Sequence, residues 1–254
     1  MTISANTLFH FTGDYLNLIS ILTRDFVPRF SLEDLNVISP KKGYSKEMEF
    51  GIPMVSFCDI PLSMVSRHIR IYGRYGIGLE KGWGIRKRIT PITYTYKNSE
   101  LSKTLYQIAK ENFRDEKNIS NKMLDNFTML LWLIKPYEGN FIRNKKQKKK
   151  YRFYDEREWR YIPKYIMNKY RFGLTKDEFN SRYERDKANL ILFSGKRLTF
   201  NSSDIRYIIV SKEKEIQDII DVLSHNAHSK KYPKETLPLI ASKIITSERI
   251  LEDF

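Results

Sequence analysis

The residues best suited to chemistry lie between Tyr151 and Pro163, where the sequence reads YRFYDEREWRYIP. If this stretch is a strand, alternate side chains share a face, so Glu156, Glu158 and Arg160 lie together and the two carboxylates are about 7 Å apart. Carboxylates that close repel each other unless a cation or a substrate lies between them, and such pairs can be tuned for acid–base or substrate-orienting roles. The same pattern is equally typical of a surface strand whose charges are solvated and cross-paired.

A strongly basic run directly precedes these acids. Residues 143–152, RNKKQKKKYR, hold seven basic side chains in ten and cannot pack in an interior, so we expect a solvated loop. Clustered lysines bind polyanions through counterion release, which favours nucleic acid, RNA in particular; a flexible solubilising loop is the alternative. The predicted phosphate contacts are Lys145, Lys146, Lys148, Lys149, Lys150 and Arg152. The aromatic side chains of Tyr151, Phe153 and Tyr154 could also stack on bases.

Composition indicates a folded protein with an anionic partner. The chain has 254 residues, 13% of them aromatic, and 45 basic against 30 acidic residues give a formal charge of +15. The single cysteine, Cys58, excludes an internal disulfide and a cysteine-based metal cluster, and it suits a reducing cytoplasm. The start of the chain lacks the features of a secretory signal and no apolar run is long enough to span a membrane, so we expect a soluble, cytoplasmic protein. His225 and His228 have no partner pattern typical of zinc, and no metal site is expected.

The first half of the chain alternates strands and helices. Leu8 to Phe11 is a predicted strand interrupted by His10, and residues 15–22 carry apolar side chains at helical spacing. Residues 53–59 are predicted to form a strand that leads into a helix over 62–72, with His68 directed toward solvent.

The second half adds further strands around a pair of helices. The alternating stretch 89–96 predicts one strand, while 99–113 and 119–134 have helical periodicity, and the apolar runs 190–193 and 205–210 predict strands. We therefore expect one α+β domain over residues 1–254, with a split, mostly antiparallel sheet, an inserted helical pair over 99–135 and a basic loop over 143–152.

Three segments together resemble a known family. These are LFHFT at the start, the block from VSFCDIPL to YGIGLEKGWG over residues 55–84, and DEREWRYIP over 155–163. They resemble the AbiGi family of bacterial abortive phage-resistance proteins, and the order of the segments, the DIRYIIV strand and the ERILEDF tail are similar too. This resemblance implies a role in phage defence, and proteins of that family have been labelled antitoxins.

A more distant resemblance, to ADP-ribosyltransferase folds including DarT-like toxins, implies a mechanism. It would assign His10 to the ribose of NAD, Glu158 to the oxocarbenium-like centre that forms as nicotinamide leaves, and Glu156 to the acceptor. The other cofactor-binding residues it implies are Thr12, Ser56, Phe57 and Tyr75. A fixed carboxylate stabilises the cationic transition state more than the ground state, so the chemistry is reasonable. We then expect His10 and Glu158 to meet in one cleft of an ADP-ribosyltransferase-like sheet.

Three functions remain open from sequence. The first is a toxin-type effector that uses NAD to ADP-ribosylate nucleic acid or protein. The second is a non-catalytic antitoxin or RNA-binding partner, acting with a cognate toxin or antitoxin, in which the glutamates are structural. The third is a metal-dependent nuclease built on Asp59, Asp155, Glu156 and Glu158.

Overall fold

The computed structural model describes residues 4–38, 48–112, 120–143, 146–166, 169–225 and 231–253, and its largest element is a nine-stranded sheet. Neighbouring strands follow the order β13 (Ile244–Thr246), β12 (Ile205–Val210), β4 (Tyr75–Glu80), β1 (Thr7–Thr12), β3 (Glu49–Cys58), β10 (Glu158–Tyr161) and β5 (Thr90–Pro91). Two more strands, β2 (Arg29–Asp34) and β11 (Leu174–Thr175), pair with β3 beside this path. Every pairing in the sheet is antiparallel except that of β12 with β13. The predicted α+β class with a mostly antiparallel sheet is confirmed.

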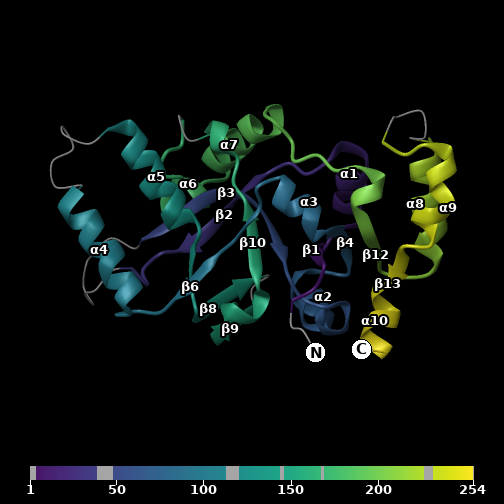
Figure 1. Ribbon diagram of the computed structural model, residues 1–254, viewed down its shortest axis with the longest axis horizontal. Helices are drawn as coiled ribbons and strands as arrows, with labels where there is room; N and C mark the ends of the chain where they lie inside the picture. The colour runs from purple at the N-terminus through teal and green to yellow at the C-terminus, as the bar shows by residue number, and fades with distance from the viewer. Residues whose placement is uncertain are drawn as a thin grey trace.

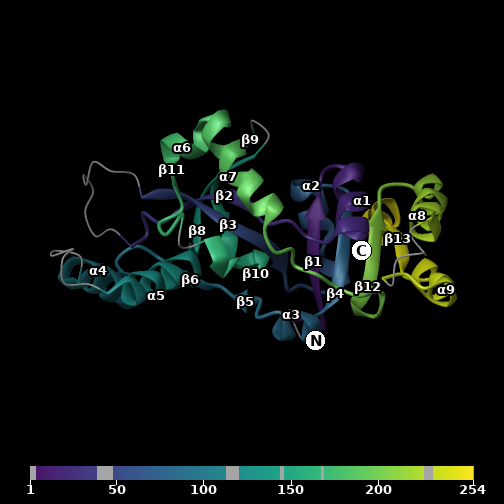
Figure 2. The ribbon, with the colours of Figure 1, turned by 90° about the horizontal axis from the view of Figure 1, so that it is seen from above.

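Helices lie at both ends and on both faces of this sheet. Figures 1 and 2 show the sheet crossing the middle of an elongated molecule, with α4 and α5 at one end and α8 and α9 at the other. The helices are α1 (Tyr15–Arg24), α2 (Ser66–Tyr72), α3 (Lys81–Arg86), α4 (Glu100–Asn112), α5 (Asn121–Trp132), α6 (Lys176–Asn180), α7 (Arg182–Ser194), α8 (Lys214–His225), α9 (Leu237–Ala241) and α10 (Ser247–Asp253). None of the helices in the described ranges is long and apolar enough to cross a membrane.

Successive residues of the central strands enter two different hydrophobic cores, as the alternation of a strand requires. The first core holds Leu8, Phe57 and Ile208 from the strands, with Leu18, Leu22 and Trp83 from α1 and α3. The second core holds Phe9, Cys58 and Ile209 from the same strands, with Val65, Ile69 and Ile250 from the opposite side. The sheet is therefore covered on both faces, and the core to which a side chain belongs tells which face it occupies.

One predicted strand is wrong and another is wrong in part. Residues 190–193 belong to α7, because Ser181 caps a helix by accepting a hydrogen bond from the Glu184 amide, and Ala188 and Leu192, four residues apart, are both buried. Residues 89–96 do not form one strand: Thr90–Pro91 is β5 in the large sheet, and β6 (Thr93–Thr95) pairs in parallel with β7 (Ile134–Pro136). A four-residue apolar run does not distinguish a strand from part of a helix. The alternating run indicates a strand but does not show which other strand it pairs with.

The predicted basic loop is mostly a β-hairpin. Strand β9 (Lys146–Arg152) pairs antiparallel with β8 (Glu138–Arg143), and Asn144 and Lys145 between them lie outside the described residues. After β9 the chain forms a 3-10 turn, Phe153–Glu156, and only Glu158–Tyr161 is strand. The single strand expected over the acidic stretch is thus replaced by a turn and a short strand.

Candidate functional site

Glu156 and Glu158 converge on one lysine although they come from different elements. Glu156 ends the 3-10 turn, Arg157 adopts a left-handed conformation with φ of 48°, and Glu158 begins β10. Lys135 of β7 donates hydrogen bonds to Glu156 Oε2 at 2.9 Å and to Glu158 Oε2 at 2.8 Å. The cation that two neighbouring carboxylates require is therefore a side chain of this protein.

Arg160 extends the group of ion pairs into the interior. Its side chain is 0% exposed, and its Nε atom donates to Glu158 Oε1 at 2.7 Å. Its terminal nitrogens donate to Glu33 Oε2 of β2 at 2.6 Å and to the Trp132 carbonyl at 2.8 Å. We call the side chains of Glu33, Lys135, Glu156, Glu158 and Arg160 the buried ion cluster.

Neutral hydroxyl groups complete the cluster. Ser56 Oγ of β3 donates to Glu158 Oε1 at 2.9 Å, and the Tyr94 hydroxyl accepts a 2.9 Å hydrogen bond from the Glu158 amide. The Tyr72 hydroxyl of α2 donates to Glu156 Oε1. The two oxygens of Glu158 thus accept from a serine, a lysine and an arginine, which satisfies the carboxylate without a ligand.

The pKa values follow from this pairing. Burial alone would raise the pKa of Glu158, but the charges of Arg160 and then Lys135 overcome it and hold that pKa well below its ordinary value. Burial would lower the pKa of Lys135, yet the carboxylates, with Glu158 first, raise it. Glu158 therefore stays ionised at neutral pH, which excludes it as a proton donor there, and its negative charge is already paired with Lys135 and Arg160.

His10 does not share a cleft with Glu158, and that prediction is wrong. The registers pair Phe9 with Cys58 and Cys58 with Glu158, so these three side chains point to one face of the sheet. His10, one residue on, points to the other face, where its ring contacts Phe26 and Phe57 of the first core. Its Nδ1 atom lies 2.9 Å from the Ser56 carbonyl, so the expected partner of this histidine is the backbone.

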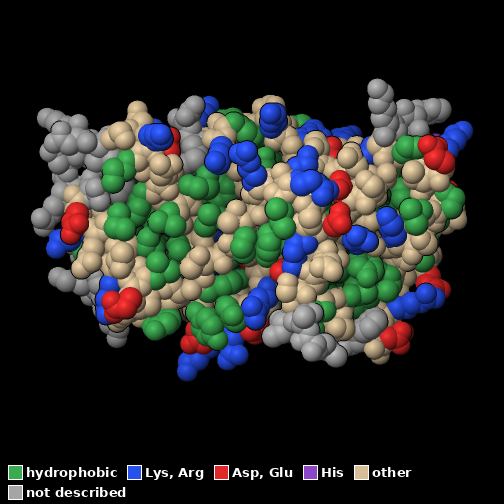
Figure 3. All heavy atoms as spheres, viewed as in Figure 1, with side chains coloured by type: hydrophobic (Ala, Val, Ile, Leu, Met, Phe, Trp, Pro, Cys, Tyr) green, Lys and Arg blue, Asp and Glu red, His purple; other side chains and the backbone are tan. Residues whose placement is uncertain are grey.

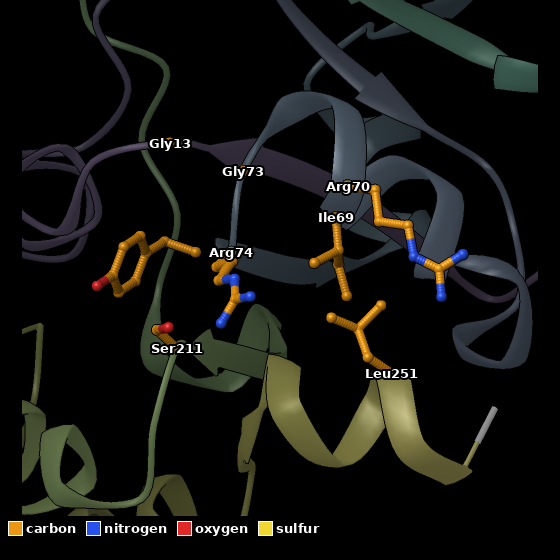
Figure 4. Close-up of a pocket in the computed structure, with 8 residues that line it drawn as sticks. Gly13, Ile69, Arg70, Gly73, Arg74, Ser211 and Leu251 are labelled. Carbon is orange, nitrogen blue, oxygen red and sulfur yellow. The ribbon is translucent and has the colours of Figure 1, made fainter.

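The remaining residues predicted to bind a cofactor lie elsewhere. Phe57 belongs to the first core, whereas Thr12 pairs with Tyr75 at the end of β1 and β4, beside a pocket of about 430 Å³ (Figure 4). The Tyr75 hydroxyl donates a hydrogen bond to Glu215. In the pocket, the Arg74 guanidinium points toward Ser211, whereas the Arg70 guanidinium points away from it (Figure 4). Neither Glu156 nor Glu158 lines this pocket, so the predicted cofactor set is divided among three places.

The basic hairpin differs from the sequence prediction in its aromatic residues. Lys149, Lys150 and Arg152 are exposed as expected, but Tyr151 is 4% and Phe153 9% exposed. The rings of Tyr151, Phe153 and Phe141 pack on one another, so Tyr151 and Phe153 are not available to stack on bases. Tyr154 is 36% exposed, with the Arg157 guanidinium 4.3 Å from its ring centre.

The acids proposed for a nuclease do not converge. Asp59 pairs with Lys81 and accepts from Ser4, and Asp155 pairs with Arg67 on the surface. Within the described ranges, no group of three or more histidine, cysteine or acidic side chains is arranged to hold a metal ion. The geometry gives the nuclease hypothesis no support.

The cluster contains residues that sequence reasoning missed. Lys135, Glu33, Tyr72 and Tyr94 come from four elements remote from the acidic stretch, and their contacts depend on tertiary pairing. The one available signal was Lys135, a lone lysine that directly follows the apolar run at the end of α5. His68 was expected in solvent but is 5% exposed, with its ring stacked on Tyr72.

Comparison with known proteins identifies relatives of this chain. Residues 24–211 match the family model named AbiGi, which is described as an abortive phage resistance protein and an antitoxin. The abortive phage resistance protein AbiGi of Lactococcus lactis subsp. cremoris is 30% identical over 249 residues, which cover 90% of this chain and 99% of the relative. No solved structure gives a significant match.

Proposed function

The chain belongs to the AbiGi family, and from that premise we propose that it acts in abortive phage resistance as an antitoxin that binds and restrains a cognate toxin protein. The relative and the family description support the defence role, and the description of the family as an antitoxin supports the finer assignment. Restraint of a toxin by binding requires no catalytic centre in this chain.

One observation carries this proposal beyond the family description. The two acids best suited to catalysis are held by Lys135 and Arg160 in the interior, where Glu156 is 4% and Glu158 6% exposed. A catalytic carboxylate must reach its substrate, and the burial of both acids supports a structural role for them. In this proposal the two acids bind the 3-10 turn and β10 to β7 through Lys135, and Arg160 adds β2 through Glu33, which is a structural task.

The competing hypothesis is an NAD-dependent transferase. Binding of NAD remains a prediction from sequence. It requires a histidine and a glutamate around one ribose, whereas His10 and Glu158 lie on opposite faces of β1 and β10. A transferase using these residues would need the central sheet to rearrange. The antitoxin proposal needs no such change.

A growth assay tests the proposal. The chain would be expressed alone, then together with each protein encoded beside it, with an empty vector as the control. We expect normal growth with the chain alone, growth arrest with one neighbouring protein alone, and recovery when both are present. Co-purification of the two proteins would accompany recovery. Growth arrest by the chain alone would contradict the proposal, as would the absence of any neighbouring protein that it neutralises.

A further inference from the structure

We propose that the β8–β9 hairpin is a phosphate-binding element through which the protein holds the backbone of RNA or DNA without reading base sequence. This goes beyond toxin binding and does not depend on it. The hairpin lies apart from the large sheet, as a two-stranded unit at the lower edge of the molecule in Figure 1.

The hairpin is rich in positive charge, and its three described basic side chains, Lys149, Lys150 and Arg152, are exposed. Residues 138–152 contain seven basic residues and one acidic residue, Glu138. Among the described residues, no carboxylate lies within 4 Å of the charged nitrogens of Lys149, Lys150 or Arg152, although Glu138 faces Arg152 in the hairpin register. Lys and Arg side chains project at the same lower edge of the molecule in Figure 3, with Asp and Glu side chains beside them. Exposed lysines without partners repel one another, and a polyanion relieves that repulsion.

Aromatic contacts join the base of the hairpin to the rest of the protein. The Phe141 and Tyr151 rings stack with centroids 4.8 Å apart, and the Arg67 guanidinium lies 4.7 Å from the centre of the Tyr151 ring. Phe141 further contacts Tyr72 of α2, whose hydroxyl donates to Glu156. Lys149 and Lys150 therefore directly precede a residue whose ring is anchored to the interior, which lowers the entropy lost when they bind a ligand.

The same packing determines the class of ligand. Protein interfaces and amphipathic membrane helices use exposed aromatic and aliphatic side chains, but Tyr151 and Phe153 of this segment are turned inward. What it offers outward is positive charge, which recognises phosphate and carries no base-specific contact. A nucleic-acid backbone is the ligand that such a surface fits, and each phosphate contact should release counterions.

The test compares two variants of the full-length protein with equal charge loss. In K149Q/K150Q both lysines come from the hairpin; in the control K212Q/K214Q both exposed lysines come from the segment that enters α8, at the far end of the molecule (Figure 1). Binding of a labelled single-stranded RNA and a labelled DNA duplex would be measured over a range of salt concentrations. Circular dichroism would verify that both variants are folded.

For the hairpin variant we expect the slope of log affinity against log salt to fall by roughly 0.7 per lost contact on RNA and 0.9 on duplex DNA. The control should keep the wild-type slope. Equal falls in both variants would overturn the proposal, because binding would then follow net charge alone. Absence of wild-type binding, or K149Q/K150Q-sensitive binding to anionic lipid vesicles with none to nucleic acid, would also overturn it.

Discussion

The buried ion cluster and the basic hairpin are neighbours in sequence and opposites in physical chemistry. In the cluster, Lys135 and Arg160 meet three carboxylates at distances of 2.6 to 2.9 Å, while Lys149 and Lys150 of the hairpin extend into solvent. A dense run of charged residues can therefore form buried ion pairs or an exposed charged surface. Charges that pair in the interior become part of the fold and are costly to separate, whereas exposed charges without an ion pair are available to a partner.

Tyr72 connects the two regions. Its hydroxyl donates to Glu156 in the cluster, and its ring contacts Phe141 of the hairpin and stacks on His68. Substitutions in the cluster should therefore lower the free energy of unfolding strongly, and substitutions in the hairpin should weaken nucleic-acid binding. Protonation of His68, which stacks on Tyr72, should make the free energy of unfolding depend on pH.

The largest effect is expected for Arg160→Met. This change leaves Glu33 and Glu158 buried without their main cation, and breaking one side of a buried ion pair costs about 3–5 kcal/mol. Urea unfolding would measure the loss. The control is Arg206→Met, which removes an ion pair with Glu80 whose side chains are 53% and 37% exposed, and which should cost about 0–1 kcal/mol. Similar losses in the two variants would remove the contrast on which the comparison depends.

A smaller, pH-dependent effect is expected at His68. Burial lowers the pKa of His68 to about 4 from an ordinary value of 6.5, so between these values the unfolded chain binds more protons. Protonation thus favours unfolding, and His68 should cost the wild type about 3 kcal/mol of stability between neutral pH and pH 4.

The variant His68→Phe should remove that part of the acid sensitivity. No hydrogen-bond partner of either His68 ring nitrogen is found in the described part of the chain, so phenylalanine loses no partner and the variant should be as stable as the wild type at pH 7. Urea unfolding from pH 7 to pH 4 would measure the profile. A profile parallel to that of the wild type would mean that His68 is hydrated or paired in solution.

The smallest effect on stability is expected in the hairpin. K149Q/K150Q removes two exposed charges without known partners, so the unfolding free energy should change by less than about 0.5 kcal/mol even though nucleic-acid binding falls. Thermal unfolding at low salt would measure it. A loss near that of Arg160→Met would mean that these lysines are part of the structural framework, and the distinction between the two regions would fail.

The sequence predicted local features well. Strand β1, helix α1, strand β3 and strand β12 follow directly from apolar alternation and helical spacing, because these patterns are decided within a few residues. The acid pair was also found, together with its need for a cation. That the cation is Lys135, 21 residues before Glu156, depends on the parallel pairing of β6 with β7, which no local pattern encodes.

The errors have the same physical origin. The faces of His10 and Glu158 depend on the register of β1, β3 and β10, which brings together residues about 150 positions apart in the chain. The lysine run has low strand propensity, yet β9 forms because its Tyr151 ring is buried against Phe141. Tertiary packing outweighed local preference in both cases.

The most direct test of the central claim, that Glu158 is structural, is release of nicotinamide from labelled NAD by the purified protein, with and without an RNA or a cell extract as acceptor. Glu158→Gln serves as the matched variant. We predict that the wild type releases no more nicotinamide than this variant, since the Glu158 oxygens are already occupied by Ser56, Lys135 and Arg160. Release by the wild type that falls about a hundredfold or more in Glu158→Gln, with the fold retained, would contradict the account and restore a catalytic role.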